Sequence, residues 1–447
     1  MPTHSDAGRE SHQATEPATG ASLARVVGVP GAVLMGLGSI LGTGIFVSIG
    51  IAAGVAGPAV VLAVALAAIV ATFNGLSSAQ LAASHPVSGG TYEYGYRYLN
   101  PALGFTAGWM FLCAKSASAA TAALGFAGYV LTSIGAQGDL ARIVLGLAIV
   151  VTLTAVVAGG MHRSNRTNAI IVSLTLLVLV VFVLAGLPAL VANGTSRFVP
   201  FISSDAGGIS GLLHGTALMF VAYTGYGRIA TLGEEVRDPS HSIPRAIVIT
   251  LAVTMALYVA VVAVAVGVVG APGLAEATRT AAAPLEVVAQ GFTVPGVAWL
   301  VAVAAITAMV GVLLNLLLGL SRVMLAMGRR RDLPAWLAHV DQRQKSPRRA
   351  VIVTGALIAG LVLVGNVKTT WSFSAFTVLV YYALTNLSAL RLPADKRRFP
   401  RFIPVLGILS CLGLAFWVEP IIWAAGLGLI GVGLVAHLVA RSWRVDS

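Results

Sequence analysis

The chain alternates between long apolar stretches and short polar ones. A helix needs about 17 to 25 apolar residues to cross a bilayer. By this measure we expect transmembrane helices over residues 28–51, 58–83, 103–133, 141–160, 168–190, 211–235, 246–270, 296–325, 349–366, 371–391, 402–418 and 420–440. The pattern therefore predicts an all-α polytopic membrane protein with about 12 transmembrane helices.

Two of these stretches contain residues that interrupt a helix. The first carries Gly38, Gly42 and Gly44 among hydroxyl residues, and the sixth carries a break over 223–227. Hydrocarbon does not solvate free backbone groups, so such breaks are tolerated only inside protein or beside a cavity. Close packing of small residues would explain Gly38 and Gly42, but it leaves Gly44 and the hydroxyls unexplained. The breaks therefore predict a binding site.

Composition excludes a soluble domain. The 447 residues are 57% hydrophobic and only 10% charged, and the mean hydropathy is +0.90.

Cys113 and Cys411 both lie in apolar segments, which argues against a disulfide framework. Residues 1–25 are polar and predicted to be disordered, and they lack the pattern of a signal peptide. We therefore expect the first span to be retained.

Basic residues alternate from loop to loop. With 12 spans, both termini lie on one side of the membrane. Of the 28 Lys and Arg residues, two lie within spans and four in loops on the other side, which leaves 22 on the side of the termini. The four are Arg142, Arg197, Arg279 and Lys368. This bias places the termini in the cytoplasm of a plasma-membrane protein, whereas a face that binds nucleic acid would not alternate.

The spans divide into two groups of five. Each group begins with an interrupted span, and an odd number of spans gives the groups opposite orientations. We expect a cytoplasmic N-terminus over 1–25, a first repeat over 26–190 and a second over 209–392. Two further helices over 400–440 and a cytoplasmic tail over 441–447 complete the chain. The predicted fold is a five-plus-five inverted repeat with broken helices 1 and 6 and two extra C-terminal helices.

Several motifs resemble those of the amino acid–polyamine–organocation permeases. They are the glycine run of the first span, with Leu41 where isoleucine is common, and the segments 86–94, 104–109, 220–239 and 321–334. The segment 220–239 is most similar to the cationic amino acid transporter branch. The resemblance covers nearly all of 28–440. It implies alternating access, with an amino acid held between spans 1 and 6.

The two breaks can bind the two charged ends of an amino acid. Backbone N–H groups at the first break suit the carboxylate, and backbone carbonyls at the second suit the ammonium. The predicted substrate-binding residues are Ser39, Ile40, Gly42, Thr43, Gly44, Phe220, Val221, Ala222, Tyr223, Gly225 and Tyr226. Tyr223 and Tyr226 are expected to pack on the substrate or to gate it, although Tyr226 could equally be an interface aromatic.

Two positions depart from the family pattern. Many members carry an acidic residue directly after the aromatic residue of span 6, where this chain has Gly227 followed by Arg228. A basic substrate would lose a carboxylate partner there, so we expect a neutral amino acid. Gln80 stands where the family often has glutamate, and a neutral amide cannot relay protons.

Lys115 is the candidate coupling residue. It lies near the middle of the third span, where an unpaired ammonium costs about 2.5 kcal/mol or more. Sodium-coupled relatives use hydroxyls of span 8, which residues 311–315 do not offer. Some proton-coupled relatives carry a lysine on span 5, at a position that matches Thr175 here. We hypothesise that Lys115 supplies the titratable cation; the alternative is a lysine held by carbonyls with no transport role.

Other predictions concern the gate and competing functions. Arg228, Glu234 and Glu235 are expected to form an ion network at the cytoplasmic gate, or a solvated helix end.

The main expectation is proton-coupled uptake of a neutral amino acid, without cofactor or metal. The alternatives are an amino acid exchanger, a transporter of cationic amino acids or polyamines, and a sensor that does not transport. An enzyme is disfavoured because neither HExxH nor GxSxG occurs.

Overall fold

The computed structural model describes residues 27–85, 89–160, 165–202, 204, 207–230, 236–341 and 347–445. Within these ranges the protein is helical, and the β-structure is a single parallel bridge between Val27 and Val236. Eight helical stretches of the described residues are long and apolar enough to cross a membrane. The prediction of an all-α polytopic membrane protein is therefore confirmed.

The helices follow the predicted spans closely. The first half contains α1 (Val29–Ile40), α2 (Ile49–Ala56), α3 (Val60–Ser84), α4 (Thr91–Tyr98), α5 (Pro101–Ser133), α6 (Asp139–Ala158) and α7 (Asn165–Asn193). The second half contains α8 (Gly208–Tyr223), α9 (Gly227–Ala230), α10 (Pro239–Ala281), α11 (Pro284–Gln290), α12 (Val297–Arg329), α13 (Arg348–Val362) and α14 (Val367–Leu390). The chain continues with α15 (Phe402–Ala415) and α16 (Pro420–Val445).

Both predicted interruptions are present, and they differ in severity. After α1 the backbone turns extended at Leu41 (φ −72°, ψ 104°) and resumes as a π-helical turn over Gly44–Ser48. Between α8 and α9 the chain tightens only to a 3₁₀ turn over Thr224–Tyr226. The first break therefore exposes more backbone than the second.

Local sequence explains where two central helices begin. Asn100 precedes α5 and its side chain accepts from the Leu103 N–H, while Pro101 supplies a pre-set φ at the first helical position. Asn366 caps α14 in the same way. The N-cap side chains satisfy backbone donors that the first turn of each helix leaves without a partner.

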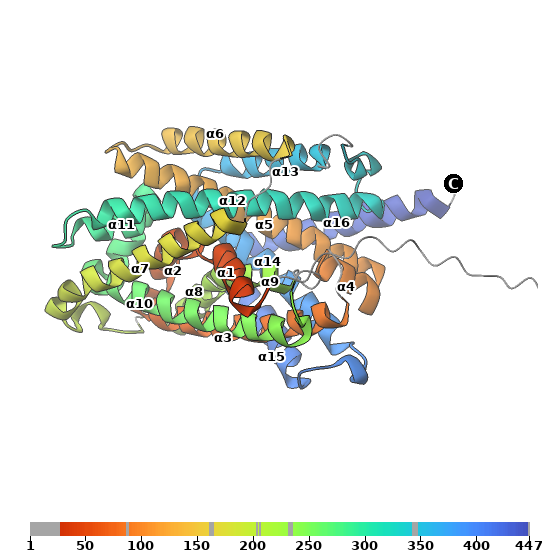
Figure 1. The fold of residues 1–447 in the computed structure, drawn as a ribbon, viewed down its shortest axis with the longest axis horizontal. Helices are drawn as coiled ribbons and strands as arrows, with labels where there is room; N and C mark the ends of the chain where they lie inside the picture. The colour runs from red at the N-terminus through yellow and green to blue at the C-terminus, as the bar shows by residue number, and fades with distance from the viewer. Residues whose placement is uncertain are drawn as a thin grey trace, which may run out of the picture.

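The bundle has a small-residue centre and an apolar periphery. In the most apolar stretch of α5, 78% of the residues are buried, against 22% in α16. The α14 helix packs against α5 and α15, and α3 packs against α8 and α10. Leu184 on α7 and Ile421 on α16 are 60% and 75% exposed, as expected for side chains that face lipid. The helices run side by side along the long axis, with α1, α8 and α14 in the middle (Figure 1).

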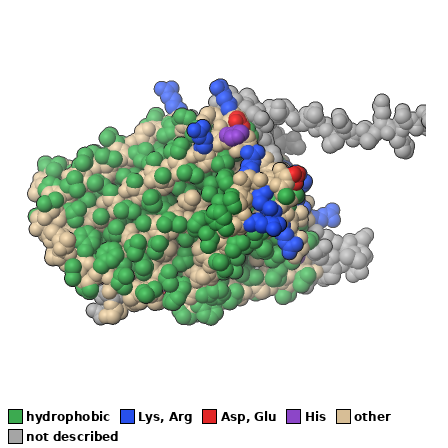
Figure 2. All heavy atoms as spheres, turned by 90° about the horizontal axis from the view of Figure 1, so that it is seen from below, with side chains coloured by type: hydrophobic (Ala, Val, Ile, Leu, Met, Phe, Trp, Pro, Cys, Tyr) green, Lys and Arg blue, Asp and Glu red, His purple; other side chains and the backbone are tan. Residues whose placement is uncertain are grey.

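The charged side chains gather at one end of the bundle. Figure 2 shows Lys and Arg side chains at the end that carries α4 and the C-terminal part of α16, while the rest of this face is apolar or uncharged. This asymmetry agrees with the distribution expected from the loops. The predicted disordered segment 1–25 lies outside the described residues, and α16 extends into the predicted tail as far as Val445.

Candidate functional site

The first break leaves backbone donors free in the middle of the bundle. Gly42, Thr43 and Gly44 are buried, and within the described residues their N–H groups have no backbone acceptor. The Thr43 Oγ1 is also buried without a hydrogen-bond partner. Free buried donors of this kind are costly, so they mark a place where a ligand can bind. Since the π-helical turn begins here, the three N–H groups also lie at the positive end of a helical segment.

The two breaks are in direct contact. A Cβ atom added to Gly44 would lie 2.5 Å from the Ala222 Cβ, and one added to Gly225 would collide with the Ser39 carbonyl. Glycine is therefore required at both positions, because any side chain would push α8 away from α1. The predicted residues of the two spans thus come together as one site.

The carbonyls of the second break are not equally available. The Val221 carbonyl accepts both the N–H and the Oγ1 of Thr224, and the latter bond is 2.8 Å long. These two bonds use both lone pairs of that oxygen. A substrate ammonium at this break would therefore depend on Phe220 and Ala222, which are both buried.

The two predicted tyrosines make different contacts. The Tyr223 hydroxyl donates to the Val64 carbonyl on α3, 3.1 Å away, so this side chain is anchored in the helix bundle. Tyr226 is fully buried and its ring centroid lies 5.5 Å from that of Tyr382 on α14. An aromatic pair across two helices suits a gate that closes by packing.

Lys115 reaches the second break directly. Its Nζ donates to the Thr224 Oγ1 at 2.8 Å, and the same Oγ1 donates to the Val221 carbonyl. The lysine is partly buried on α5. An ammonium on α5 is therefore linked through the Thr224 hydroxyl to the backbone of the last turn of α8. The sequence analysis named Lys115 but passed over Thr224, because nothing in the sequence showed which residue it meets.

Three further tyrosines bind backbone carbonyls around the breaks. Tyr258 on α10 donates to the Ile40 carbonyl at 3.0 Å, and Tyr129 on α5 donates to the Phe46 carbonyl at 2.7 Å. Tyr382 donates to the Thr224 carbonyl at 3.3 Å. These phenols satisfy acceptors that the interrupted helices leave open. Tyrosines within apolar spans, alone at 129 and 258 and paired at 381–382, were the available signal, but the sequence did not show which carbonyl each one reaches.

The remaining predicted residues lie apart from this cluster. Thr175 is buried on α7, where its Oγ1 donates to the Ile171 carbonyl at 2.8 Å. Arg228 is exposed on α9, while Glu234 and Glu235 lie outside the described residues. The coupling role of Thr175 and the gating network both stay predictions. No group of three or more metal-binding side chains occurs within the described part of the chain.

The fold defines the class of the protein as a polytopic α-helical membrane protein whose two interrupted helices meet. The sequence profile described as amino acid permease matches residues 31–443. The chain belongs to this family.

Known relatives agree with the family and span nearly the whole chain. An uncharacterized transporter of Mycobacterium tuberculosis is 44% identical, covering 94% of this chain and 92% of its own length. The methylthioribose transporter of Bacillus subtilis is 28% identical, with 94% of each chain covered. The branched-chain amino acid permease BcaP of Bacillus subtilis is also 28% identical, covering 94% of this chain and 93% of its own.

Proposed function

We propose that this protein is a secondary active permease that takes up a neutral amino acid by alternating access. The observation that carries the proposal is the set of three free N–H groups at Gly42, Thr43 and Gly44, beside the carbonyls of α8. An α-amino acid has one carboxylate for the donors and one ammonium for the carbonyls. Binding through backbone atoms leaves the substrate side chain to be selected by the surrounding residues.

Two features favour a neutral side chain. Gly227 offers no carboxylate beside the second break, and the Lys115 ammonium already lies at Thr224. A second cation in the same apolar surroundings would be repelled. The permease BcaP, named for branched-chain amino acids, is among the relatives, which is consistent with this choice. A cationic amino acid or polyamine is the substrate class that the charge of Lys115 disfavours.

The coupling ion of the proposed mechanism is the proton. Lys115 is the only Lys or Arg residue of α5. Its hydrogen bond to Thr224 connects α5 to the second break. Loss of its proton would remove a charge from the site and weaken that bond. Protonation would in this way bias the position of α8 against α5. Thr175 takes no part in this step of the proposal.

The proposed location is the plasma membrane, with both termini in the cytoplasm. The gathering of Lys and Arg at the end that carries α4 and the end of α16 supports this orientation (Figure 2). The opposite end, with α11, would then face outward.

Uptake into proteoliposomes tests the proposal. The purified protein is offered a panel of radiolabelled neutral and cationic amino acids, with and without an inward proton gradient. We expect uptake of a neutral amino acid that an acidic exterior accelerates. If counterflow is equally fast with and without a pH gradient, the protein is instead an exchanger. No uptake and no ligand-induced thermal shift with any amino acid would contradict the permease itself.

A further inference from the structure

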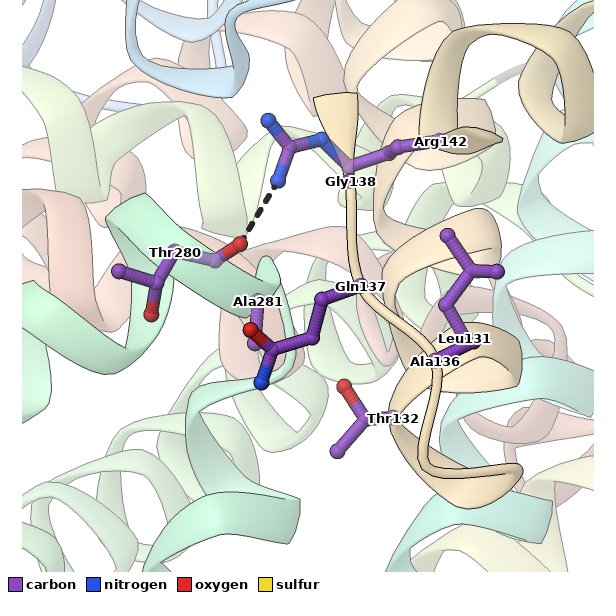
Figure 3. Close-up of a pocket in the computed structure, with 8 residues that line it drawn as sticks. All are labelled: Leu131, Thr132, Ala136, Gln137, Gly138, Arg142, Thr280 and Ala281. Carbon is purple, nitrogen blue, oxygen red and sulfur yellow. Dashed lines mark hydrogen bonds between the residues drawn. The ribbon is translucent and has the colours of Figure 1, made fainter. Parts of the chain in front are cut away.

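A short segment covers the end of the bundle that lies opposite the C-terminal end of α16 (Figure 1). Gly270 (φ 75°) interrupts α10, and the chain then runs across this end as residues 271–281 followed by α11. We call residues 271–290 the lid segment. At its edge, the Arg142 Nη1 donates to the Thr280 carbonyl at 3.1 Å, beside a cavity of about 10 Å³ that lies between the lid and the α5–α6 loop (Figure 3).

The lid segment is closed onto the first interrupted span. A Cβ atom on Gly50 of α2 would collide with the Thr278 side chain, and one on Gly128 of α5 would collide with the Ala281 carbonyl. The α11 helix also contacts the π-helical turn Gly44–Ser48. The lid therefore lies directly on the element that carries the free N–H groups.

Glu286 lies on α11, where its side chain contacts α5. It is only 3% exposed although it is a carboxylic acid. Its Oε1 lies 3.1 Å from the Ser133 Oγ, and its Oε2 has no hydrogen-bond partner among the described residues. A buried carboxylate that lacks a partner is strongly disfavoured, whereas a neutral carboxylic acid is tolerated.

Hydrogen-bond counting also favours the neutral acid. The Ser133 hydroxyl has one hydrogen, but it lies within reach of two acceptors: the Tyr129 carbonyl at 2.8 Å and Glu286 Oε1 at 3.1 Å. If Glu286 carries a proton, it can donate to Ser133, which then donates to the Tyr129 carbonyl. Only in the protonated state are both contacts of the Ser133 hydroxyl, to the Tyr129 carbonyl and to Glu286 Oε1, hydrogen bonds at the same time.

The charges around Glu286 do not neutralise it. The neighbouring cations are engaged elsewhere, because Arg142 pairs with Asp139 and Arg279 pairs with Glu276. From α5 the titratable group that lies near Glu286 is the phenol of Tyr129. Burial raises the pKa of Glu286 from 4.5 to about 7, and the Ser133 hydroxyl offsets only part of this rise.

We propose that Glu286 is a proton-binding site formed when the lid segment closes, so that closure takes up one proton from the side opposite the C-terminal end of α16. With the lid open, Glu286 would meet water and regain an ordinary carboxyl pKa near 4.5. Between that value and about 7, the closed lid holds a proton that the open lid releases. Opening therefore becomes about tenfold more favourable per pH unit in this window and levels off above it. The link to proton-coupled uptake rests on the proposed function, but the lid equilibrium does not.

The test measures lid opening without substrate or gradient. Ala277 is a buried residue of the lid segment itself, and a cysteine there (Ala277→Cys) is expected to react with maleimide only when the lid opens. Its labelling rate is divided by that of an exposed cysteine, Val294→Cys, to remove the pH dependence of the thiol. Labelling of protein without either added cysteine corrects for Cys113 and Cys411. We expect the normalised rate to rise about twentyfold from roughly pH 5.5 to 7.5, with most of the rise below pH 7.

Two carboxyl variants make the result specific. Glu286→Gln keeps the shape and a donor for Ser133, so its normalised labelling rate should be low and independent of pH. Glu276→Gln removes an exposed carboxylate of the same segment. The pH dependence of its normalised labelling rate should match that of the protein that carries both glutamates. The same pH dependence in Glu286→Gln, or a flat profile with Glu286 present, would overturn the proposal.

Thermal unfolding in detergent gives a second readout. A carboxyl whose pKa is raised on folding contributes stability at low pH that is lost as pH rises from about 4.5 to 7. Glu286→Gln should remove this loss, so its Tm should fall less than that of the parent over the same range. Equal falls would also count against the proposal. A flat labelling profile would leave the permease assignment standing, and transport without proton coupling would leave the lid equilibrium standing.

Discussion

The Nζ of Lys115 donates a 2.8 Å hydrogen bond to the Oγ1 of Thr224, across the interface between α5 and the 3₁₀ turn that follows α8. Thr224 in turn donates to the Val221 carbonyl. A change in the charge of one side chain is thereby transmitted to the backbone of an interrupted helix.

Replacing Lys115 with methionine should separate charge from packing. The methionine fills similar space but cannot donate to Thr224. We expect amino acid uptake to fall about tenfold, equivalent to roughly 1.4 kcal/mol, and to lose its dependence on external pH. Uptake by Lys115→Met with unchanged rate and pH profile would show that the lysine is structural.

Thr224 tests the same link from the other helix. Thr224→Val keeps the shape but removes the hydroxyl that accepts from Lys115, and an unpaired buried group costs about 1–3 kcal/mol. Thr224→Ser keeps the hydroxyl and serves as the matched control. Uptake and Tm should both fall in the valine variant and stay close to the parent in the serine variant. Equal behaviour of the two variants would mean that the hydroxyl has no role.

The contact between the two breaks should tolerate no added methyl group. Gly44→Ala places a Cβ 2.5 Å from that of Ala222, and overpacking of this kind costs about 1–3 kcal/mol. We expect substrate binding to be lost and Tm to fall. Gly319→Ala on α12 is the control, because nothing lies within 4 Å of its Cβ position. If both variants bind substrate equally well, the close approach of the breaks is not required.

A buried carboxylate at the charged end should stabilise the fold. Asp332 accepts from the hydroxyls of Tyr92 at 2.7 Å and Tyr96 at 2.6 Å, and it lies 3.3 Å from the ring nitrogen of His437. Asp332→Ala takes this acceptor away from two phenols, at a cost of about 1–3 kcal/mol each.

Thermal unfolding of Asp332→Ala in detergent measures the effect, and Asp395→Ala, at an exposed position, is the control. The Asp332 variant should unfold several degrees lower than the parent, while the control should not change. A Tm equal to that of the control would show that the phenols find other acceptors.

Several features of the molecule could be predicted from residue order alone. The apolar stretches anticipated the helices because hydrocarbon requires long uninterrupted runs of backbone hydrogen bonds. The glycines at 38, 42 and 44 marked the first break, because a helix of that composition can open at low cost. The imbalance of Lys and Arg among the loops likewise anticipated the charged end of the bundle (Figure 2).

Other features depend on contacts between residues far apart in the chain. Neither the pairing of Lys115 with Thr224 nor the burial of Glu286 beside Ser133 follows from residue order, because both depend on how rigid helices pack. Likewise, only packing showed that the Val221 carbonyl is already occupied and that the second break is a mild 3₁₀ turn. Periodicity reports which face of a helix is apolar, whereas the partner of each polar atom is decided when the helices meet.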